Sequence, residues 1–461
     1  MQTGLNSHND LPREEIAADC LVQLTIKKYS PRKALKTLGI IDKSIEYPAV
    51  FALVTEVVRR DNTLKRIANS IILDIFTNEP RFNSSLKFFP LFVQKLIIIG
   101  TYRTILEDPL QKFPLVTSCI INIVKRRNFQ QWLKYIKKFF HELEKFDFLK
   151  WVSHIKDPLD RIVIETSMPT WLTRSLLKNS DYEEVKDILS YLNYQPPIYI
   201  RLNSLKDKEV VFQELKENNI QYTEDPNFSN IFRIKYLGKA RLPNLNSYKK
   251  GHFFIQSRTS AYIPLIIDPS PEDIILDTCA SPGGKTTLLA DLMGNNGKIY
   301  AFEVNKERFN ELNKNISKFN VKNVESQCAD IRTITDLEQQ DIIMIDAPCS
   351  GTGTLASRPY IKWLLSKQKI KFYSKLQLEI ITSASKFLKP ETGRLYYITC
   401  SLLPEENEDI IKLFLESTNE NFVPIPLKYK FGRSLPYNGQ RLLPHIMESE
   451  GFTIFCLKRL K

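Results

Sequence analysis

The feature that most constrains the fold is a regular alternation of short apolar runs and longer helical patterns in the C-terminal half. The apolar runs are 274–276, 298–302, 324–328, 342–345 and 394–398, with helical patterns such as 306–319 and 367–388 between them. Parallel strands need a long crossover connection, which is usually a helix. The alternation therefore predicts an α/β fold over residues 256–461, a doubly wound, Rossmann-like sheet with helices on both faces.

Two further domains are expected before this one. In residues 1–165, apolar positions recur at three- and four-residue steps with few glycines, which predicts an all-α domain. Two strand-like runs, 198–205 and 231–237, then flank a helical pattern at 208–219. These runs predict a small α/β module at residues 166–255.

The balance of charge favours a polyanionic partner. The chain has 65 lysines and arginines against 52 aspartates and glutamates, a formal net charge of +13. The helical pattern near residues 129–146 carries Lys134, Lys137 and Lys138 on its polar sides. This is a candidate basic face for RNA, although an ordinary amphipathic helix with a solvated side is the commoner explanation of such a pattern.

Other classes of protein are disfavoured by composition. No stretch reaches the roughly 18 uninterrupted apolar residues of a membrane-spanning helix, so no membrane partner is expected. The seven cysteines are widely spread, without zinc-site spacing, which argues against a disulfide framework and a metal site. We expect a monomer in a reducing compartment, the cytoplasm or, in a eukaryote, the nucleus or nucleolus.

A glycine-rich segment, 277–287, directly follows the first predicted strand of the large sheet and opens a helix. Its glycines allow backbone N–H groups to approach a ligand, and the helix N-terminus favours a polar or anionic group. The tail at Gly284, Lys285 and Thr286 is similar to the end of a P-loop. A P-loop needs glycine where this chain has Cys279, so the NTPase interpretation is weak.

Three acids follow three successive predicted strands. Glu303 ends the second strand, roughly 20 residues after the glycines, where doubly wound folds place an acid for ribose hydroxyls. Asp330 follows the third strand and Asp346 ends the fourth. Each acid alone is more often a helix N-cap or a surface residue. Together, at one edge of a sheet, they predict a site for a nucleoside-containing cofactor.

Two cysteines occupy equivalent positions after predicted strands. Cys349 follows the fourth strand and Cys400 the fifth, so the thiols would share one crevice if these strands are neighbours. A helix N-terminus after each cysteine would lower the thiol pKa and favour the thiolate nucleophile. Four of the other cysteines are expected to be small buried hydrophobic residues: Cys20, Cys119, Cys328 and Cys456.

These motifs carry a resemblance to a known family. The chain resembles the nucleolar-protein/Sun (Fmu) family of RNA (cytosine-5)-methyltransferases, in the branch of the bacterial 16S rRNA enzyme with a NusB-like helical domain. The matching segments, in the family's order, are 201–206, 277–287, 346–353, 358–363, 399–407, 441–445 and 451–452. The resemblance implies an RRM-like module at 166–255 and a NusB-like, RNA-binding domain at 1–165.

The resemblance also implies catalytic roles. Cys400 would attack carbon 6 of cytosine, and Cys349 would assist release of the carbon 5 proton and of the enzyme. Asp346 would hydrogen-bond the edge of the base, and Lys285 would help to keep a nearby thiol ionised.

The implied cofactor is S-adenosyl-L-methionine. Glu303 would bind its ribose, Asp330 would lie by its adenine, and Asp346 would lie beside its methionine part. The backbone of the glycine-rich loop would surround it, through Cys279, Ala280, Ser281, Pro282, Gly283, Gly284 and Lys285.

The implied substrate is RNA, with rRNA favoured and tRNA as the alternative. Candidate RNA contacts are Arg201, Asn203, Lys206, Arg358, Lys362 and His445. A competing hypothesis is a non-catalytic RNA-binding or ribosome-assembly factor that keeps the fold. Thiols at two strand ends argue against it, because binding alone would not need them.

Overall fold

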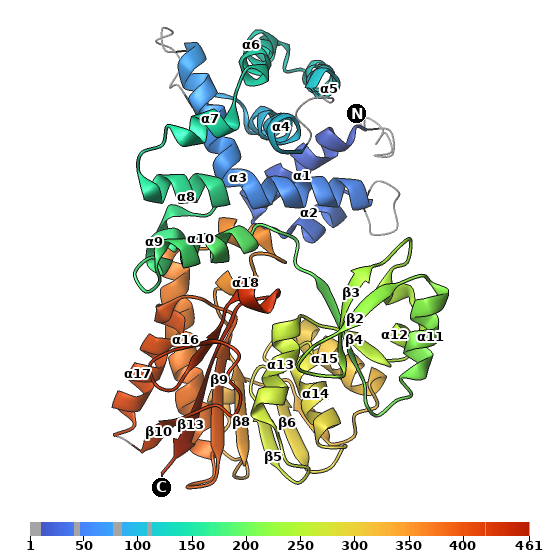
Figure 1. Ribbon diagram of the computed structural model, residues 1–461, viewed down its shortest axis with the longest axis vertical. Coiled ribbons are helices and arrows are strands. Elements are labelled where there is room, and N and C mark those ends of the chain that lie inside the picture. Colours follow the sequence, from blue (N-terminus) through green and yellow to red (C-terminus); the bar gives the residue numbers. More distant parts are fainter. Residues whose placement is uncertain (1–10, 41–46, 77–84, 108–112, 420, 461) are drawn as a thin grey trace, which may run out of the picture. The chain divides into compact units, whose positions relative to one another are not determined.

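The computed structural model describes residues 11–40, 47–76, 85–107, 113–419 and 421–460 (Figure 1). The chain forms two compact units. One comprises Met1–Asn193 together with Arg358–Leu364, and the other comprises Tyr194–Ser357 together with Leu365–Lys461. No helix in the described ranges is long and apolar enough to cross a membrane.

The first unit is all-α, as predicted. Its α-helices are α1 (Arg13–Lys27), α2 (Pro31–Thr37), α3 (Tyr47–Phe76), α4 (Leu91–Thr101), α5 (Phe113–Arg126), α6 (Leu133–Glu144), α7 (Phe148–Ser153), α8 (Pro158–Thr166), α9 (Thr170–Leu176) and α10 (Tyr182–Tyr191). The amphipathic pattern near residue 136 forms a short 3-10 turn, Gln130–Trp132, followed by α6. Ile136, Phe139 and Phe140 of α6 are buried in the helical core.

The helical unit extends beyond the predicted boundary at residue 165. Asn62 of α3 donates a hydrogen bond to the carbonyl of Met168 at 2.7 Å, and Thr63 donates one to the carbonyl of Ile164. These contacts tie the chain around α8 and α9 to the long helix α3. The units accordingly divide after Asn193, and the small α/β module belongs to the second unit.

A short segment from the C-terminal half, Arg358–Leu364, packs within the helical unit. Lys362 is buried there, and its Nζ donates to the carbonyls of Arg59 and Ser167 and to Oδ1 of Asn193 at 2.8–3.3 Å. Burial, with Arg59 and Arg60 nearby, lowers the pKa of Lys362 to about 7. The prediction that Lys362 contacts RNA is wrong, because its ammonium group is enclosed by these protein acceptors.

The second unit begins with a four-stranded antiparallel sheet. Its strands are β1 (Ile198–Leu202), β2 (Gln221–Glu224), β3 (Ile231–Tyr236) and β4 (Phe253–Ile255), with helices α11 (Glu209–Glu217) and α12 (Asn246–Lys249). The spatial order is β2-β3-β1-β4, built from a β-α-β-β-α-β sequence. Ile200, Val211 and Phe253 lie in its core. The sequence predicted β1, α11 and β3; strands β2 and β4 are short and were not predicted.

The large sheet confirms the doubly wound prediction. All five apolar runs are parallel strands: β5 (Ile274–Asp277), β6 (Lys298–Phe302), β7 (Val324–Gln327), β8 (Ile342–Asp346) and β9 (Arg394–Thr399). The order β9-β8-β5-β6-β7 places the reversal of strand order between β5 and β8. An antiparallel extension that was not predicted follows β9: β13 (Phe452–Arg459), β12 (Gln440–Leu442) and β11 (Arg433–Ser434), with β10 (Phe422–Ile425) also paired to β13.

Helices cover both faces of this sheet (Figure 1). Ile275 and Met344 point to the face that packs with α13 (Arg258–Ile267) and α14 (Gly284–Leu292). Their neighbours Leu276, Ile343 and Ile345 point to the face that packs with α16 (Lys367–Ala384) and α17 (Glu408–Ser417). Alternating side chains bury both faces, so the carboxyl edge of the sheet is where polar side chains gather.

Candidate active site

The glycine-rich loop is held firmly between β5 and α14. The backbone N–H of Ala280 donates to the carbonyl of Phe302 at 2.9 Å, which joins the loop to the end of β6. Ser281 and Arg308 exchange two hydrogen bonds of 2.8 Å, each from a side chain to the other's carbonyl. Gly283 has φ +98°, a conformation that side-chain-bearing residues rarely adopt. The predicted cofactor loop therefore has a fixed shape beside β5 and β6.

Asp277, the last residue of β5, is a buried acid to which the sequence analysis gave no role. Burial raises the pKa of this carboxyl group to about 7. Its oxygens accept hydrogen bonds from Thr286 Oγ1 at 2.7 Å and from the N–H of Cys279 at 3.4 Å. Asp277 thus fastens the loop to the first turn of α14. In the sequence, the position of Asp277 at the end of the first predicted strand of the large sheet was the pattern that indicated a role at the site.

Glu303 lies at the end of β6, with 3% of its surface exposed. Its Oε1 accepts a hydrogen bond from the N–H of Asn305 at 2.9 Å. Its Oε2 has no hydrogen-bond partner in the described part of the chain, although Arg308 Nη1 lies 3.5 Å away. A buried acceptor without a donor is rare. This oxygen suits a ligand hydroxyl group, which is what the predicted ribose contact requires.

Asp330 differs from Glu303, because its carboxylate is already occupied. Arg332 donates to both carboxylate oxygens at 2.6–3.1 Å, and the side chain also caps a 3-10 turn, Ile331–Thr333. The hydrogen bonds from Arg332 lower the pKa of Asp330. The structure thus gives Asp330 the capping role that the sequence analysis considered commoner, and its place by the adenine stays a prediction.

Lys285 and Asp346 form an ion pair at the carboxyl edge, with Nζ and Oδ2 2.7 Å apart. Lys285 belongs to the first turn of α14 and Asp346 ends β8. Burial alone would lower the pKa of Lys285, but the Asp346 carboxylate, with a smaller contribution from Cys400, raises it above its ordinary value. Lys285 is therefore a permanent cation close to both the cofactor loop and Cys400.

The two predicted cysteines meet at the ends of β8 and β9. These strands are parallel neighbours, and the Sγ atoms of Cys349 and Cys400 lie 3.2 Å apart although 51 positions separate them in the sequence. The N–H of Gly353 donates to the carbonyl of Cys400 at 2.9 Å, and a Cβ on Gly353 would lie 3.0 Å from that oxygen. The loops after the two strands therefore pack directly against each other.

The prediction that the thiol pKa is lowered is wrong for Cys349. Its hydrogen bond with Cys400, then burial and the charge of Glu406, raise the pKa of Cys349 well above its usual value. The elements that follow the cysteines are short 3-10 turns, Thr352–Thr354 and Pro404–Glu406, rather than long helices. Cys349 is thus a protonated thiol beside Cys400. Among the other cysteines, Cys328 is exposed, contrary to the prediction that it is buried.

Two of the predicted RNA contacts are interior residues. Arg201 is 1% exposed, and its guanidinium donates to Gln256 Oε1 and Thr287 Oγ1 at 3.1 Å each. Asn203 is also buried, and its Nδ2 donates to the carbonyls of Gly251 and Phe319. The prediction that these two side chains contact RNA is contradicted by their burial. Both instead join β1 to neighbouring segments of the second unit.

Three other predicted RNA contacts keep some exposure. Arg358 is exposed, whereas Lys206 and His445 are half-buried. Lys206 Nζ donates to the carbonyls of Lys250 and Lys318. RNA contact through these three residues stays a prediction. The described residues contain no cluster of three or more histidine, cysteine or acidic side chains arranged to hold a metal ion.

Comparisons with known proteins identify the family. A family model described as 16S rRNA methyltransferase RsmB/F matches residues 264–458. The chain is 30% identical over 302 residues to the probable ribosomal RNA small subunit methyltransferase B of Synechocystis sp.. The aligned residues make up 64% of this chain and 67% of the relative. The chain belongs to the RsmB/F family of methyltransferases.

Further relatives extend the likeness. The chain is 30% identical over 297 residues to the 26S rRNA (cytosine-C(5))-methyltransferase nsun-1 of Caenorhabditis elegans, over 60% of this chain and 44% of the relative. A solved methyltransferase homolog protein from Pyrococcus horikoshii is 30% identical, with a TM-score of 0.58, and covers 66% of this chain and 100% of its own. The solved protein PH0851 is 25% identical with a TM-score of 0.76, over 98% of this chain and 99% of that one. The fold of PH0851 thus matches nearly the whole of this chain.

Proposed function

We propose that this RsmB/F protein transfers a methyl group from S-adenosyl-L-methionine to carbon 5 of a cytosine in RNA, with rRNA favoured and tRNA the alternative. The observation that carries the proposal is the pair of thiols, Cys349 and Cys400, 3.2 Å apart at neighbouring strand ends. The printed name of the relative nsun-1, a 26S rRNA (cytosine-C(5))-methyltransferase, supports the same chemistry.

Cytosine needs covalent activation, because carbon 5 of its ring is a weak nucleophile. In the proposed mechanism, the Cys400 thiolate attacks carbon 6, and the ring becomes an enamine that is nucleophilic at carbon 5. We assign to Lys285, whose ammonium group interacts electrostatically with Cys400, the stabilisation of the attacking sulfur. The covalent bond to Cys400 breaks only as the carbon 5 proton leaves.

Cys349 and Asp346 have complementary roles in the proposed mechanism. Once Cys400 is bonded to carbon 6, Cys349 loses the hydrogen bond that is the main cause of its raised pKa, and it gives its own proton to water. The Cys349 thiolate then accepts the carbon 5 proton, and the electron pair of that C–H bond restores the double bond between carbons 5 and 6 as Cys400 leaves carbon 6 as a thiolate. Asp346, oriented by its ion pair with Lys285, hydrogen-bonds the N3/N4 edge of the base and stabilises the adduct. A stacked base cannot reach these groups, so the target cytosine is single-stranded or flipped out of a helix.

S-adenosyl-L-methionine, when bound, supplies the electrophilic methyl group. The residues fit this cofactor, because the buried Glu303 Oε2 has no hydrogen-bond donor in the described residues and suits a ribose hydroxyl group. The fixed loop from Cys279 to Lys285 and the carboxylate of Asp346 would hold the rest of the molecule, with Asp330 near the adenine.

The proposal is tested by incubating the purified protein with rRNA or tRNA and labelled S-adenosyl-L-methionine. We expect label in 5-methylcytidine after nucleoside digestion, and bisulfite sequencing of the RNA then maps the modified position. Tight RNA binding without any methylated cytidine, in either class of RNA, would instead favour the non-catalytic binding factor.

Glu303→Gln should weaken cofactor binding. The amide places an N–H donor where the carboxylate oxygen accepts from the ribose, and losing a hydrogen bond to a charged group costs about 1.5–3 kcal/mol. We expect the Kd for S-adenosyl-L-methionine to rise about 10- to 100-fold in isothermal titration calorimetry without RNA. Glu307→Gln is the matched control, because Glu307 is an exposed acid four residues away. Equal affinities of both variants and the parent would contradict the role of Glu303.

We further propose that the helical domain helps to dock RNA. Lys125, Lys134 and Lys137 are exposed on α5 and α6. Arg126 and Arg127, by contrast, form ion pairs with Glu15, and Lys138 donates to the carbonyl of Ile75. The three exposed lysines are therefore the best candidates for phosphate contacts.

Replacing Lys125, Lys134 and Lys137 by glutamate should weaken RNA binding and flatten its salt dependence. Each lost phosphate contact reduces the slope of log K against log[salt] by about 0.7–0.9. We expect a total decrease of about 2 in a filter-binding or fluorescence titration from 50 to 300 mM KCl. A slope equal to that of the parent protein would place the RNA elsewhere.

A further inference from the structure

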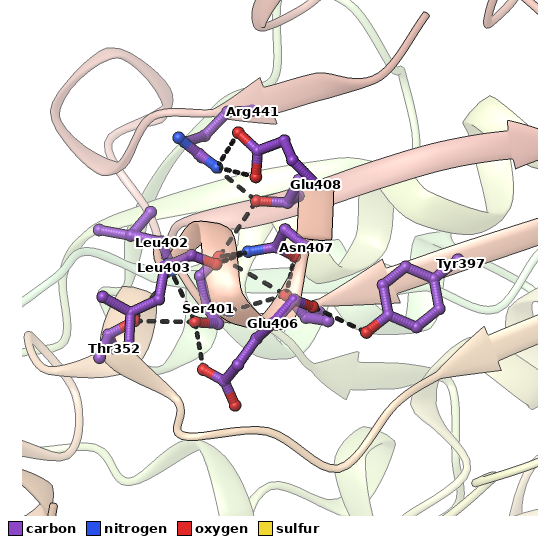
Figure 2. Close-up of polar contacts among 11 residues, drawn as sticks. Thr352, Tyr397, Ser401, Leu402, Leu403, Glu406, Asn407, Glu408 and Arg441 are labelled. Carbon is purple, nitrogen blue, oxygen red and sulfur yellow. Dashed lines mark hydrogen bonds and ion pairs between the residues drawn. The ribbon is translucent and has the colours of Figure 1, made fainter. Parts of the chain in front are cut away.

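The loops that carry the two cysteines share one buried carboxylate, that of Glu406. This residue ends the 3-10 turn Pro404–Glu406 and has 0% of its surface exposed. Its Oε1 accepts a hydrogen bond from the N–H of Ser350 at 2.7 Å. Its Oε2 accepts from the hydroxyl group of Ser350. The same oxygen accepts from the hydroxyl group of Ser401 at 2.5 Å, the contact that Figure 2 shows. Ser350 directly follows Cys349, and Ser401 directly follows Cys400.

Hydrogen-bond donors surround the carboxyl group of Glu406. Gln377 Nε2 adds a fourth donor at 3.3 Å to those from Ser350 and Ser401. Burial raises the pKa of Glu406, while the hydrogen bonds from Ser350 and Ser401 stabilise the anion and oppose this effect. A carboxylate that accepts from two loops at once holds them at a defined separation.

Other contacts also hold the two loops, among them the hydrogen bond from the N–H of Gly353 to the carbonyl of Cys400 and a contact of 3.3 Å between the hydroxyl groups of Ser350 and Ser401. The N–H of Leu402 donates to Thr352 Oγ1 at 2.9 Å. Asn407 Nδ2 donates to the carbonyls of Ser401 and Leu403, which holds the backbone after Cys400 (Figure 2). Only Glu406, among these, bonds to the residue that directly follows each cysteine.

We propose that Glu406 is a positioning residue that sets the separation of Cys349 and Cys400 by clamping Ser350 and Ser401. The inference rests on the proposed function for its catalytic consequence, since Cys349 can assist release of the base only if its thiol stays beside Cys400. The hydrogen bonds from Ser350 and Ser401 to Glu406, which we call the clamp, form in the protein without RNA or cofactor. The clamp can therefore be measured separately from methyl transfer.

The experiment measures thiol proximity by disulfide formation. Diamide takes up the two thiol hydrogens and leaves one S–S bond between Cys349 and Cys400, and mass spectrometry of the cross-linked peptide pair gives the rate. In Glu406→Ala the serines lose their shared acceptor, and we expect the rate to fall at least about tenfold. In Glu406→Gln the amide oxygen still accepts from the Ser350 N–H, and its NH₂ group can donate to the two hydroxyl groups. The rate should then stay within about threefold of the parent.

Two further variants separate positioning from stability. Glu408→Gln is the matched control, because Glu408 is two residues away and largely buried, yet pairs with Arg441 instead of the cysteine loops (Figure 2). It should leave the disulfide rate unchanged. Ser401→Ala removes one arm of the clamp with a smaller change in packing than Glu406→Ala, and should slow the cross-link even if Glu406→Ala does not fold.

Turnover provides the second measurement. Glu406→Ala and Ser401→Ala should lower kcat for RNA methylation at least tenfold, with an unchanged Kd for S-adenosyl-L-methionine, and Glu406→Gln should restore most of the activity. Disulfide rates and kcat equal to those of the parent in both variants would overturn the proposal. A parent protein that never methylates RNA, but cross-links more slowly after loss of Glu406, would overturn the proposed function and leave the clamp intact.

Discussion

Cys400→Ala should abolish methylation of cytosine, by on the order of 10⁴-fold or more, because no other group in the proposed mechanism activates the base. Incorporation of labelled methyl groups into RNA measures the loss. Cofactor affinity should stay close to that of the parent, since Cys400 attacks the base and does not bind the cofactor. A Cys400→Ala protein with unchanged turnover would exclude the covalent mechanism.

Cys349→Ala should have the opposite effect on the covalent intermediate. Attack by Cys400 proceeds, but release of the adduct loses its assisting thiol, so protein–RNA adducts accumulate and survive denaturation in SDS. The double variant with Cys400→Ala should form none. Cys328→Ala is the control, because Cys328 is exposed and follows the distant strand β7. Adducts in the double variant would assign the nucleophile to another residue.

Arg201→Ala should produce the largest loss of stability. Its guanidinium lies 3.7 Å from the Asp291 carboxylate and beside the rings of Phe254 and Phe319, with centroids 5.7 and 5.8 Å away. Removing one partner of a buried ion pair leaves the other charge without compensation, which costs about 3–5 kcal/mol. We expect the unfolding transition of the second unit to move to lower urea concentration by a corresponding amount.

Arg233→Ala is the matched control for Arg201. Arg233 lies on β3 of the same sheet, but its ion pair with Glu448 is partly exposed, at 29% and 49% of the two side chains. Pairs of this kind contribute about 0–1 kcal/mol. The comparison also tests the role of Arg201, because a direct RNA contact would lower RNA affinity and leave the unfolding free energy unchanged.

The large sheet was predictable because its signal is local. Each central strand is an apolar run such as 342–345, and each crossover helix has its own periodicity. The antiparallel strands β10 to β12 gave no such signal, because they are short; β10 and β12 pair with β13, and β11 pairs with β12 at the end of the sheet. Their positions depend on long-range pairing, which no local pattern encodes.

The candidate site was predictable where its acidic and thiol side chains directly follow the ends of parallel strands. Glu303, Asp346, Cys349 and Cys400 lie at or after the carboxyl ends of parallel strands, so strand order alone brings them to one edge. Glu406 was not predicted, since its role depends on hydrogen bonds from residues 56 and 5 positions away. The prediction for Arg201 was wrong for a related reason. A charged side chain is expected to be exposed unless its buried partners are known, and for Arg201 these include Asp291.

The segment Arg358–Leu364 has a practical consequence for dissecting the protein. The chain passes between the two units after residues 193, 357 and 364, so a single protease cut after Asn193 leaves residues 358–364 of the helical unit on the C-terminal fragment. A fragment that ends at residue 193 lacks Lys362 and leaves the carbonyls of Arg59 and Ser167 without that donor. The helical unit is therefore discontinuous in the sequence, and we expect residues 358–364, grafted onto a chain that ends at residue 193, to stabilise it.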